Sequence, residues 1–565
     1  MRPASTSIRV SKHILTIAAA CATATLGGCT TPFGEFRGED YATMRVPHER
    51  LRTISTVSLE SQSLSPPRSV EEAAAARLRG WSPASMRSND DRVELTLADV
   101  RAAALANNLD LQVVLYDPTI AGTTVSEEAA RFEWTFTSTI RRRKADMPTA
   151  SVLNSSQLTN DDIDFGVRIP LYTGGTVNMN VPLNRNETNN IFSTLNPAYS
   201  SDFRFSISQP LLRNAGLRVN THGIRVARYQ QQIADARTKL EAVRILAAAD
   251  RAYWRVYASM RELEVRVQQY ELAERQLERA RRRVDAGVDA EIEVMRAEAG
   301  VAERLEAIIV ADNTLRQRQR DLKRIVNIPG LPIGSPAQLV PATTPSPLGL
   351  ELDADALAEH AVHHRMEMLE LELRLAVDAS TIDLERNRAL PLFTLDYTYN
   401  VNGLGRSWGD SFDMLRDGSF DGWVLGLSAE IPLGNEAARA RVHRAILQRV
   451  QRLTTREQRR LAIQQEVFDA VDQLNSTWQR ILAARQAAIL AGRRLQGEER
   501  QFEVGMRTST DVLDAAASLA DAQLAEIRAL ADYEVAMIDI AFATGTLLGQ
   551  AQVDWSPLDS PRAER

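Results

Sequence analysis

Four stretches of the chain alternate apolar and polar residues, which is the period-two pattern of a β-strand with one apolar face. In chain order they are residues 132–137, 203–208, 393–401 and 423–431. A further pair, 165–171 and 177–181, lies between the first two and is joined by a Thr-Gly-Gly turn. On pattern alone, these strands fit either a soluble β-sandwich or a membrane β-barrel with a polar lumen.

Two long stretches, residues 218–286 and 434–504, contain no proline and are compatible with helix throughout. At 1.5 Å per residue, each predicts a helix about 100 Å long. Neither stretch holds a sustained apolar run, so neither helix is expected inside lipid. Helices of this length are usually coiled-coil-like. The combination favours strands in a membrane with two helical rods projecting from it.

Both halves of the chain follow the order helix, strands, long helix, turn and helix. Leu95–Leu109 aligns with Leu352–Met366, and Val284–Gly287 aligns with Phe502–Gly505. We interpret the chain as a tandem duplication whose copies are separated by a linker with five prolines. The expected domains are a signal peptide 1–28, an N-terminal extension 29–93, a first repeat 94–330, a linker 331–350, a second repeat 351–549 and a tail 550–565.

The N-terminus has the layout of a secretory signal. A basic start at residues 2–12 precedes an apolar stretch at 14–26, and Leu-Gly-Gly-Cys ends at Cys29. This ending resembles a bacterial lipobox, in which the cysteine receives lipid, including palmitate, and becomes the first residue. An ordinary signal peptide with a chance cysteine is the alternative. Thr30 rather than aspartate after the cysteine favours the outer membrane.

Composition adds mainly exclusions. Hydrophobic residues make up 44% and charged residues 25%, which argues against a mostly disordered chain. A net charge of −6 gives no support for a nucleic-acid partner. Both cysteines, Cys21 and Cys29, precede residue 30, so the mature chain has no disulfide framework or thiolate metal cluster.

Four strands cannot close a pore and open edges are not tolerated in lipid, so several chains are expected to share one barrel.

Residues 93–549 resemble the TolC-like outer-membrane channel family, here of a lipoprotein type. The most specific match is Phe502–Ala515, which is similar to the family's hairpin tip and aperture segment. Other matches are Leu95–Asp99, Ser208–Leu212, Glu430–Leu433 and Gly545–Gly549. The resemblance implies an α+β membrane protein: a homotrimer with a twelve-stranded outer-membrane β-barrel, four strands from each protomer, continuous with a long periplasmic α-helical barrel.

The resemblance also implies a function. Family members are passive exit ducts of tripartite efflux or secretion systems, and they work with a periplasmic adaptor (membrane fusion) protein and an inner-membrane pump or ABC exporter. We therefore expect an outer-membrane channel, lipid-anchored at Cys29, whose α-barrel projects into the periplasm. The competing interpretation is a structural periplasmic coiled-coil lipoprotein, a tether without channel activity. No Ser/His/Asp or Cys/His arrangement supports an enzyme, and no cofactor is expected.

The helix ends are candidate binding surfaces. Gly287 and Gly505 stand where each long helix should stop, because a left-handed terminal residue favours glycine. Asp289 and Thr508–Thr510 follow as candidate N-caps of the return helices. By resemblance these turns dock the adaptor, and a simple turn is the competing interpretation. The residues assigned to docking are Val284, Gly287, Val288, Val504, Gly505 and Met506.

Asp511 and Asp514 are three residues apart and share a helix face. Three copies would place six carboxylates around a narrow opening, where they would attract cations. A solvated face near a helix N-terminus is the competing interpretation. By resemblance, Arg507 matches an arginine that ties neighbouring helices shut, and Glu293 matches its acidic partner. Phe502 replaces a tyrosine of some relatives, so a hydrogen bond of their closed state cannot form.

Two further motifs are weak. His360, His363 and His364 have a spacing that suits a metal on one helix face, but a solvated face is favoured because only Glu359 and Glu367 lie near them. Gly403–Gly405 is expected in a loop between two strands. A phosphate-binding loop would need a helix to follow it, and none is predicted there.

Overall fold

The computed structural model describes residues 70, 92–150, 154–288, 290–504 and 506–553. The chain divides into two units, Met1–Ser85 and Met86–Arg565. Cys29, the signal peptide and almost all of the N-terminal extension lie outside the described residues, as do Asp289 and Gly505. Among the described helices, none combines the length and apolar character that a membrane crossing requires.

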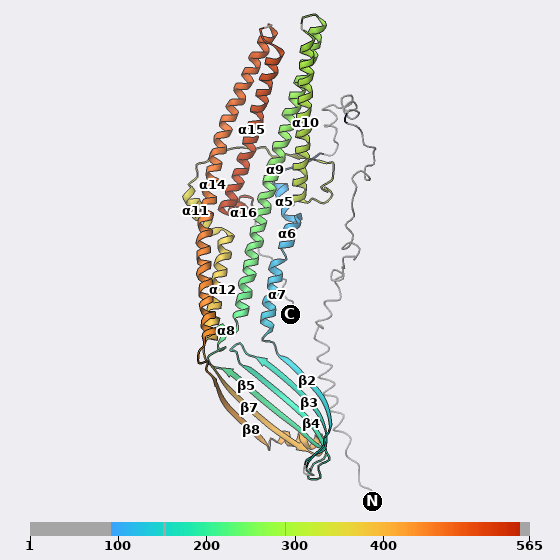
Figure 1. Ribbon diagram of the computed structural model, residues 1–565, viewed down its shortest axis with the longest axis vertical. Coiled ribbons are helices and arrows are strands. Elements are labelled where there is room, and N and C mark those ends of the chain that lie inside the picture. Colours follow the sequence, from blue (N-terminus) through green and yellow to red (C-terminus); the bar gives the residue numbers. More distant parts are fainter. Residues whose placement is uncertain (1–69, 71–91, 151–153, 289, 505, 554–565) are drawn as a thin grey trace. The chain divides into compact units, whose positions relative to one another are not determined.

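Two helical hairpins dominate the second unit (Figure 1). The first pairs α9 (His222–Asp285) with α10 (Glu291–Val326), and the second pairs α14 (Glu436–Glu503) with α15 (Ser509–Thr544). The long helices have 64 and 68 residues, and the return helices have 36 each. Both proline-free stretches are therefore single helices, as predicted. Each rises about 100 Å at 1.5 Å per residue.

Shorter helices pack beside the long ones in each half. Thr96 and Asp353 cap the first of them in each half with their side chains, which is the role that threonine and aspartate favour. The set comprises α5 (Leu97–Asn107), α6 (Leu109–Val114), α7 (Asp117–Ala130), α8 (Leu217–Asn220), α11 (Ala354–His364), α12 (Met366–Arg388) and α16 (Leu547–Gln550). Each half thus has short helices ahead of its strands and a long hairpin after them, and the duplication stays a prediction.

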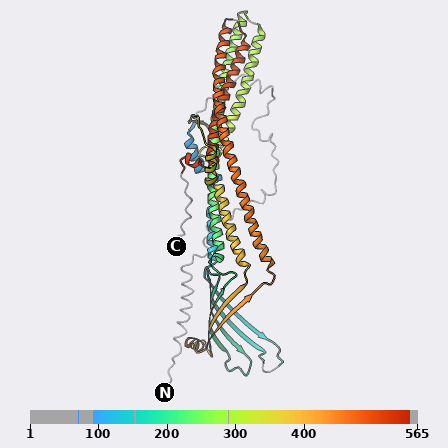
Figure 2. The same ribbon diagram turned by 90° about the vertical axis from the view of Figure 1, so that its left-hand side faces the viewer.

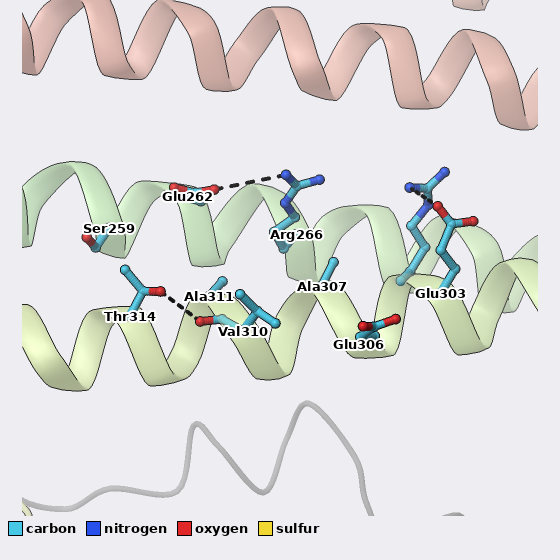
Figure 3. A pocket seen from close by; sticks show the side chains of 10 residues that line it. Ser259, Glu262, Arg266, Glu303, Glu306, Ala307, Val310, Ala311 and Thr314 are labelled. Carbon is cyan, nitrogen blue, oxygen red and sulfur yellow. Dashed lines mark hydrogen bonds and ion pairs between the residues drawn. The ribbon is translucent and has the colours of Figure 1, made fainter.

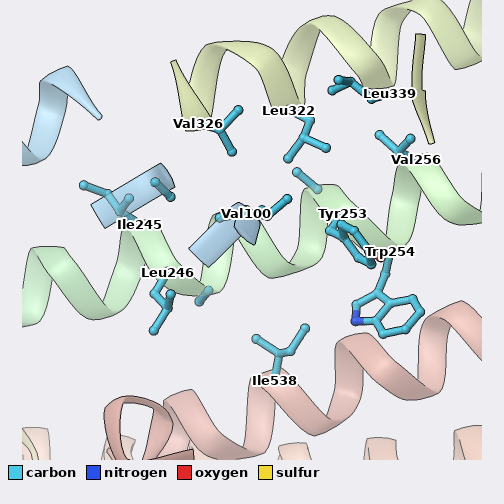
Figure 4. Close-up of a cluster of buried hydrophobic side chains, with 14 of the residues drawn as sticks. Val100, Ile245, Leu246, Tyr253, Trp254, Val256, Leu322, Val326, Leu339 and Ile538 are labelled. Carbon is cyan, nitrogen blue, oxygen red and sulfur yellow. The ribbon is translucent and has the colours of Figure 1, made fainter. Parts of the chain in front are cut away.

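The largest hydrophobic cluster surrounds the middle of α9 (Figure 4). Val100, Leu246 and Tyr253 are fully buried there, and Leu322 from α10 and Ile538 from α15 pack against them. The Tyr253 hydroxyl donates a hydrogen bond to the Leu95 carbonyl and accepts one from the Thr343 amide, at 3.2 and 2.8 Å. Because α15 belongs to the second half, this core joins the two repeats.

All the long strands form one antiparallel sheet in the order β2-β3-β4-β5-β7-β8. Its connections to α9 and α14 place the sheet at the end of the long helices opposite the hairpin turns (Figures 1 and 2). The strands are β2 (Thr135–Asp146), β3 (Gln157–Pro170), β4 (Thr176–Thr188), β5 (Ala198–Pro210), β7 (Leu392–Gly405) and β8 (Asp421–Glu430).

The expectation of four strands per protomer is wrong, because this sheet has six. The sequence left open whether the extra pair at 165–181 belongs to the barrel or to an external loop; the pair is β3 and β4, and it lies inside the sheet between β2 and β5. The strands also extend beyond the apolar alternation. There, cross-strand ion pairs replace apolar contacts: Arg185 lies 3.1 Å from Asp161, and Arg142 lies 3.4 Å from the same carboxylate. An alternation of hydrophobic residues cannot reveal the part of a strand in which the cross-strand contacts are made by charged side chains.

Two smaller expectations also change. The proline-rich linker contains a short strand, β6 (Gln338–Pro341), which pairs in parallel with β1 (Arg92–Leu95). Gly403 and Gly405 lie at the end of β7 rather than in a loop, and a helix, α13 (Trp408–Asp417), does follow them. A Cβ atom on Gly403 would lie 2.2 Å from the Ser411 carbonyl oxygen. These glycines therefore let α13 pack against the strand, which explains them without a phosphate.

Candidate functional site

The turn between α9 and α10 ends the long helix as the sequence predicted. Gly287 has φ +72°, and its amide donates to the Val284 carbonyl at 2.8 Å. The Val288 amide donates to the Arg283 carbonyl at 2.9 Å. No atom lies within 4 Å of a Cβ built on Gly287, so the backbone conformation and not crowding calls for glycine here.

Both turns present apolar side chains to solvent. Val288, Val504 and Met506 are 64%, 68% and 72% exposed, respectively, and Val284 is half-buried. The second turn closes with the Met506 amide donating to the Gln501 carbonyl at 2.9 Å. Exposed apolar groups at the end of a helical hairpin are a plausible anchor surface for another protein, so the docking assignment stays a prediction with this physical support.

The start of α15 carries the candidate aperture carboxylates. Thr508 is the N-cap, and the Asp511 carboxylate accepts from its amide and its hydroxyl at 2.9 and 2.8 Å. Hydrogen bonding, first from the Thr508 amide and then from its hydroxyl, lowers the pKa of Asp511. Asp514 is exposed one turn further along the same helix. Asp511 therefore both carries charge and completes a capping box.

Thr508→Ala is expected to fray the first turn of α15, because it removes the hydroxyl that accepts from the Asp511 amide. Hydrogen exchange by mass spectrometry should show faster exchange in residues 509–513. Thr510→Ala, two residues further along, is the matched control and should leave that exchange nearly unchanged. Equal exchange in the two variants would show that the cap does not hold this turn.

The three residues assigned to gating all lie near the turns, but within one chain they have other partners. Arg507 Nε lies 3.1 Å from Glu498 Oε2 and donates to Gln501 Oε1 at 3.0 Å. Glu293 pairs with Arg296 at 2.7 Å on its own helix. The link between Arg507 and Glu293 thus stays a prediction about neighbouring copies.

Phe502 replaces the family's tyrosine, yet it still joins the two hairpins. The guanidinium of Arg283, on α9, lies 5.5 Å from the centre of its ring, which is a cation–π geometry. Sequence reasoning missed Arg283, Glu498 and Gln501 as tip residues. The sequence did contain a signal for Arg283. It directly precedes the tip residue Val284, and Val284 aligns with Phe502 in the other repeat, so Arg283 could have been expected near the tip.

The remaining candidates are the three histidines in α11. His360 and His364 stack at 4.0 Å, and His364 Nδ1 lies 2.9 Å from the His360 carbonyl oxygen. Across the described ranges, no group of three or more histidine, cysteine, aspartate or glutamate side chains is placed to hold a metal ion. Metal binding by these histidines therefore has no support from the described residues.

A pocket of about 330 Å³ lies between α9 and α10 (Figure 3). It is open to solvent, and most of the charged side chains that line it have ion-pair partners. Glu262 lies 4.0 Å from Arg266 and 2.8 Å from Arg528 of α15, and Glu303 lies 3.6 Å from Arg304. Of these ion pairs, only Glu262–Arg528 joins two helices, α9 and α15, and the pocket is an open groove between α9 and α10.

Comparison with known proteins agrees with this architecture. Residues 357–546 match the family described as outer membrane efflux protein. Outer membrane protein TolC of Vibrio cholerae is 26% identical over 307 residues, which are 54% of this chain and 68% of that protein. A solved membrane protein from Pseudomonas aeruginosa superposes with a TM-score of 0.60 at 16% identity, covering 79% of this chain and 90% of that one. The Campylobacter jejuni CmeC outer membrane channel gives 0.58 at 14%, covering 80% and 86%.

The fold is therefore that of an outer-membrane efflux channel protomer, with a sheet at one end of two helical hairpins. Residues 357–546 match the outer membrane efflux protein family, and the chain is similar to the TolC protein of Vibrio cholerae. Channels of this family are trimeric and work with adaptor and pump partners, and its relatives are outer-membrane proteins. The family is one of channels and not of enzymes.

Proposed function

We propose that three copies of this chain form the passive outer-membrane exit duct of a tripartite efflux or secretion system. The observation that carries the proposal is the continuous apolar face of the sheet, found beside two long hairpins that have no apolar run of their own. One row across all six strands is made of paired residues Phe136, Val167, Met179, Phe205, Tyr399 and Trp423.

The apolar face ends within each strand and gives way to charged residues. In β3 the apolar positions run from Ile163 to Ile169, which is about 20 Å along the strand at 3.3 Å per residue. Outer-membrane barrels carry an apolar band about 25 Å tall. Beyond it the same face becomes charged, with the ion pairs of Asp161 and Arg185. This boundary is where water would be expected.

The opposite face of the sheet is polar and suits a water-filled lumen. The neighbouring row consists of Thr137, Gly166, Asn180, Arg204, Asn400 and Gly422. Apolar-out and polar-in alternation is the pattern of a transmembrane β-barrel. A periplasmic tether needs neither an apolar outer face nor a polar inner one, so the channel is favoured over the tether.

The finer assignments follow from this proposal. The hairpin turns around Val288 and Met506 dock a periplasmic adaptor, which connects the duct to an inner-membrane pump or ABC exporter. The Cys29 lipid anchors the chain in the outer membrane, and the helical hairpins project into the periplasm. Asp511 and Asp514 of three copies line the constriction at the far end.

Purified full-length protein in planar bilayers tests the proposal. A channel gives discrete ionic steps, and its trimer is measured by light scattering in detergent. A tether conducts no ions. Monomeric protein that inserts without conducting steps would refute the duct, and denatured protein treated in the same detergent is the control for leak.

Cys29→Ser is expected to abolish metabolic labelling of the chain with palmitate and to weaken its retention in outer-membrane fractions. Cys21→Ser is the matched control, because Cys21 lies within the predicted signal peptide and should leave labelling intact. Labelling that persists in Cys29→Ser would rule out this lipid site. Strands are expected to keep part of the protein in the membrane even without the lipid.

A further inference from the structure

The two outermost strands of the six-stranded sheet, β2 and β8, each pair on one side only within the described residues. They are also its most exposed strands: Ile140 of β2 is 77% exposed and Leu427 of β8 is 66% exposed. An unpaired strand edge is not tolerated in lipid. If the sheet lies in a membrane, as the proposed function requires, something must therefore pair with both edges.

A second copy of this chain supplies the right partner for each edge. Neighbouring strands alternate in direction, and six is an even number, so β2 and β8 run in opposite directions. The β8 strand of one copy thus meets the β2 strand of the next copy in antiparallel orientation. A head-to-tail ring of copies continues the same antiparallel ladder without interruption.

Strand length and face restrict the register of this contact. The ten residues of β8 fit within the twelve of β2, and apolar residues must stay on one face. Only two registers satisfy both conditions: Glu430 opposite Thr135, or Glu430 opposite Thr137. In the first register Asp421 faces Lys144 and Leu425 faces Ile140.

The alternative register is poorer, because Asp421 would then face Asp146 and Leu425 would face Arg142. Opposite charges across strands stabilise a pair and like charges destabilise it. The surroundings agree: the outer end of β2 carries a basic run, Arg141–Lys144, while the segment before Asp421 carries Asp410, Asp413 and Asp417 against one base, Arg416. Charge complementarity therefore selects the first register.

Closure in this register is geometrically consistent for three copies. A row of paired residues that starts at Thr135 reaches Val424 in β8, and in this register Val424 faces Arg141 of the next copy. A row of paired residues therefore returns six positions further along β2, from Thr135 to Arg141, after crossing one copy. Around a ring of three copies this shift, the shear of the barrel, is about eighteen residues, which equals the number of strands. An eight-stranded barrel whose shear also equals its strand number has a strand tilt of about 36°. Outer-membrane barrels have tilts of about 35–45°.

We propose that three copies close a single eighteen-stranded barrel, in which β8 of each copy pairs with β2 of the next and Asp421 lies opposite Lys144. The inference rests on the proposed trimeric channel and departs from the twelve strands that the family resemblance implied. Barrel diameter grows roughly linearly with strand number, so this outer opening is about 1.5 times as wide as a twelve-stranded one.

Disulfide trapping in full-length protein tests the register. The double variant Ile140→Cys with Leu425→Cys places two thiols on directly opposite residues, whose Cα atoms are about 4.5–5.5 Å apart and within disulfide reach. After oxidation with copper phenanthroline, a non-reducing gel should show covalent dimer and trimer bands. Each single variant should show neither.

Two matched pairs make the test specific. Phe136→Cys with Leu425→Cys lies four residues out of register, about 13 Å along the strand, and should remain monomeric on the gel. Arg142→Cys with Leu425→Cys reports the alternative register, and a stronger band there would overturn the stated one. Trimers that conduct ions but form no band with any pair would overturn the shared barrel alone. Protein that neither trimerises nor conducts would instead refute the proposed function.

Discussion

The double variant Asp511→Asn with Asp514→Asn is expected to lose most of the cation preference of the reconstituted channel. In the proposed trimer, three copies bring six carboxylates to one opening, and the substitution keeps side-chain size while removing these six charges. One carboxylate about 4 Å from a passing cation is worth about 1 kcal/mol in water, or roughly a fivefold preference. Reversal potentials in a salt gradient measure the change, which should be at least about fivefold.

Salt and single substitutions provide the controls for this prediction. Exposed charges are screened over about 10 Å at 0.1 M salt, so the wild-type preference should strengthen as salt is lowered. In Asp514→Asn only the Asp511 charge remains, and hydrogen bonds from Thr508 lower its pKa. Its cation preference should therefore survive to a pH below the usual aspartate range. An unchanged reversal potential in the double variant would remove these carboxylates from the aperture.

The helical part of the fold was predictable because its cause is local. Absence of proline over long windows, together with a glycine at the end of the first, defined α9 and α14 within a few residues, and Thr508 was found as an N-cap from residue type and position. The backbone hydrogen bonds of a helix form within the helix, so the residues of the segment itself determine where it begins and ends. Nothing distant in the chain needed to be known.

The strands were predictable only where an alternation of apolar and polar residues within the segment marks them. Alternation identified strand segments, but β2 continues through Arg141 and Arg143, which no hydrophobic period includes. Those residues stay in the ladder because β3 holds them, including an aspartate that reaches Arg142. The place of β3 and β4 inside the sheet is also a property of pairing. Strand order depends on partners far apart in sequence, which is why a family count of four strands was carried over wrongly.

The candidate gating residues show the same limit on a smaller scale. The resemblance picked out Arg507 but could not show that Glu498 lies 3.1 Å from it, since that contact crosses the turn of the second hairpin. The contact of Arg283 with Phe502 joins residues from different repeats. Sequence spacing reveals neighbours on one helix, whereas both of these contacts depend on how the chain folds back.

Arg507→Ser is expected to raise single-channel conductance by favouring an open aperture. An exposed ion pair contributes about 0.2–1 kcal/mol, so three equivalent pairs bias the closed state by about 0.6–3 kcal/mol. Their loss shifts the ratio of open to closed channels roughly 3- to 150-fold, since about 1.4 kcal/mol is a factor of ten. Mean conductance and open time in planar bilayers measure the shift, and unchanged values would remove Arg507 from the gate.

Arg507 has one carboxylate partner in the structure, Glu498, and a second, Glu293, that the family resemblance implies, and matched variants separate them. If Arg507 acts by bracing its own hairpin, Glu498→Gln should raise conductance as Arg507→Ser does, because it removes the observed ion pair. If Arg507 instead ties a neighbouring copy, Glu293→Gln should do so while Glu498→Gln does not. In the double variant with Arg507→Ser, the true partner adds no further increase, because two residues that form one contact are not additive. Fully additive increases for both glutamates would mean that neither of them is the partner.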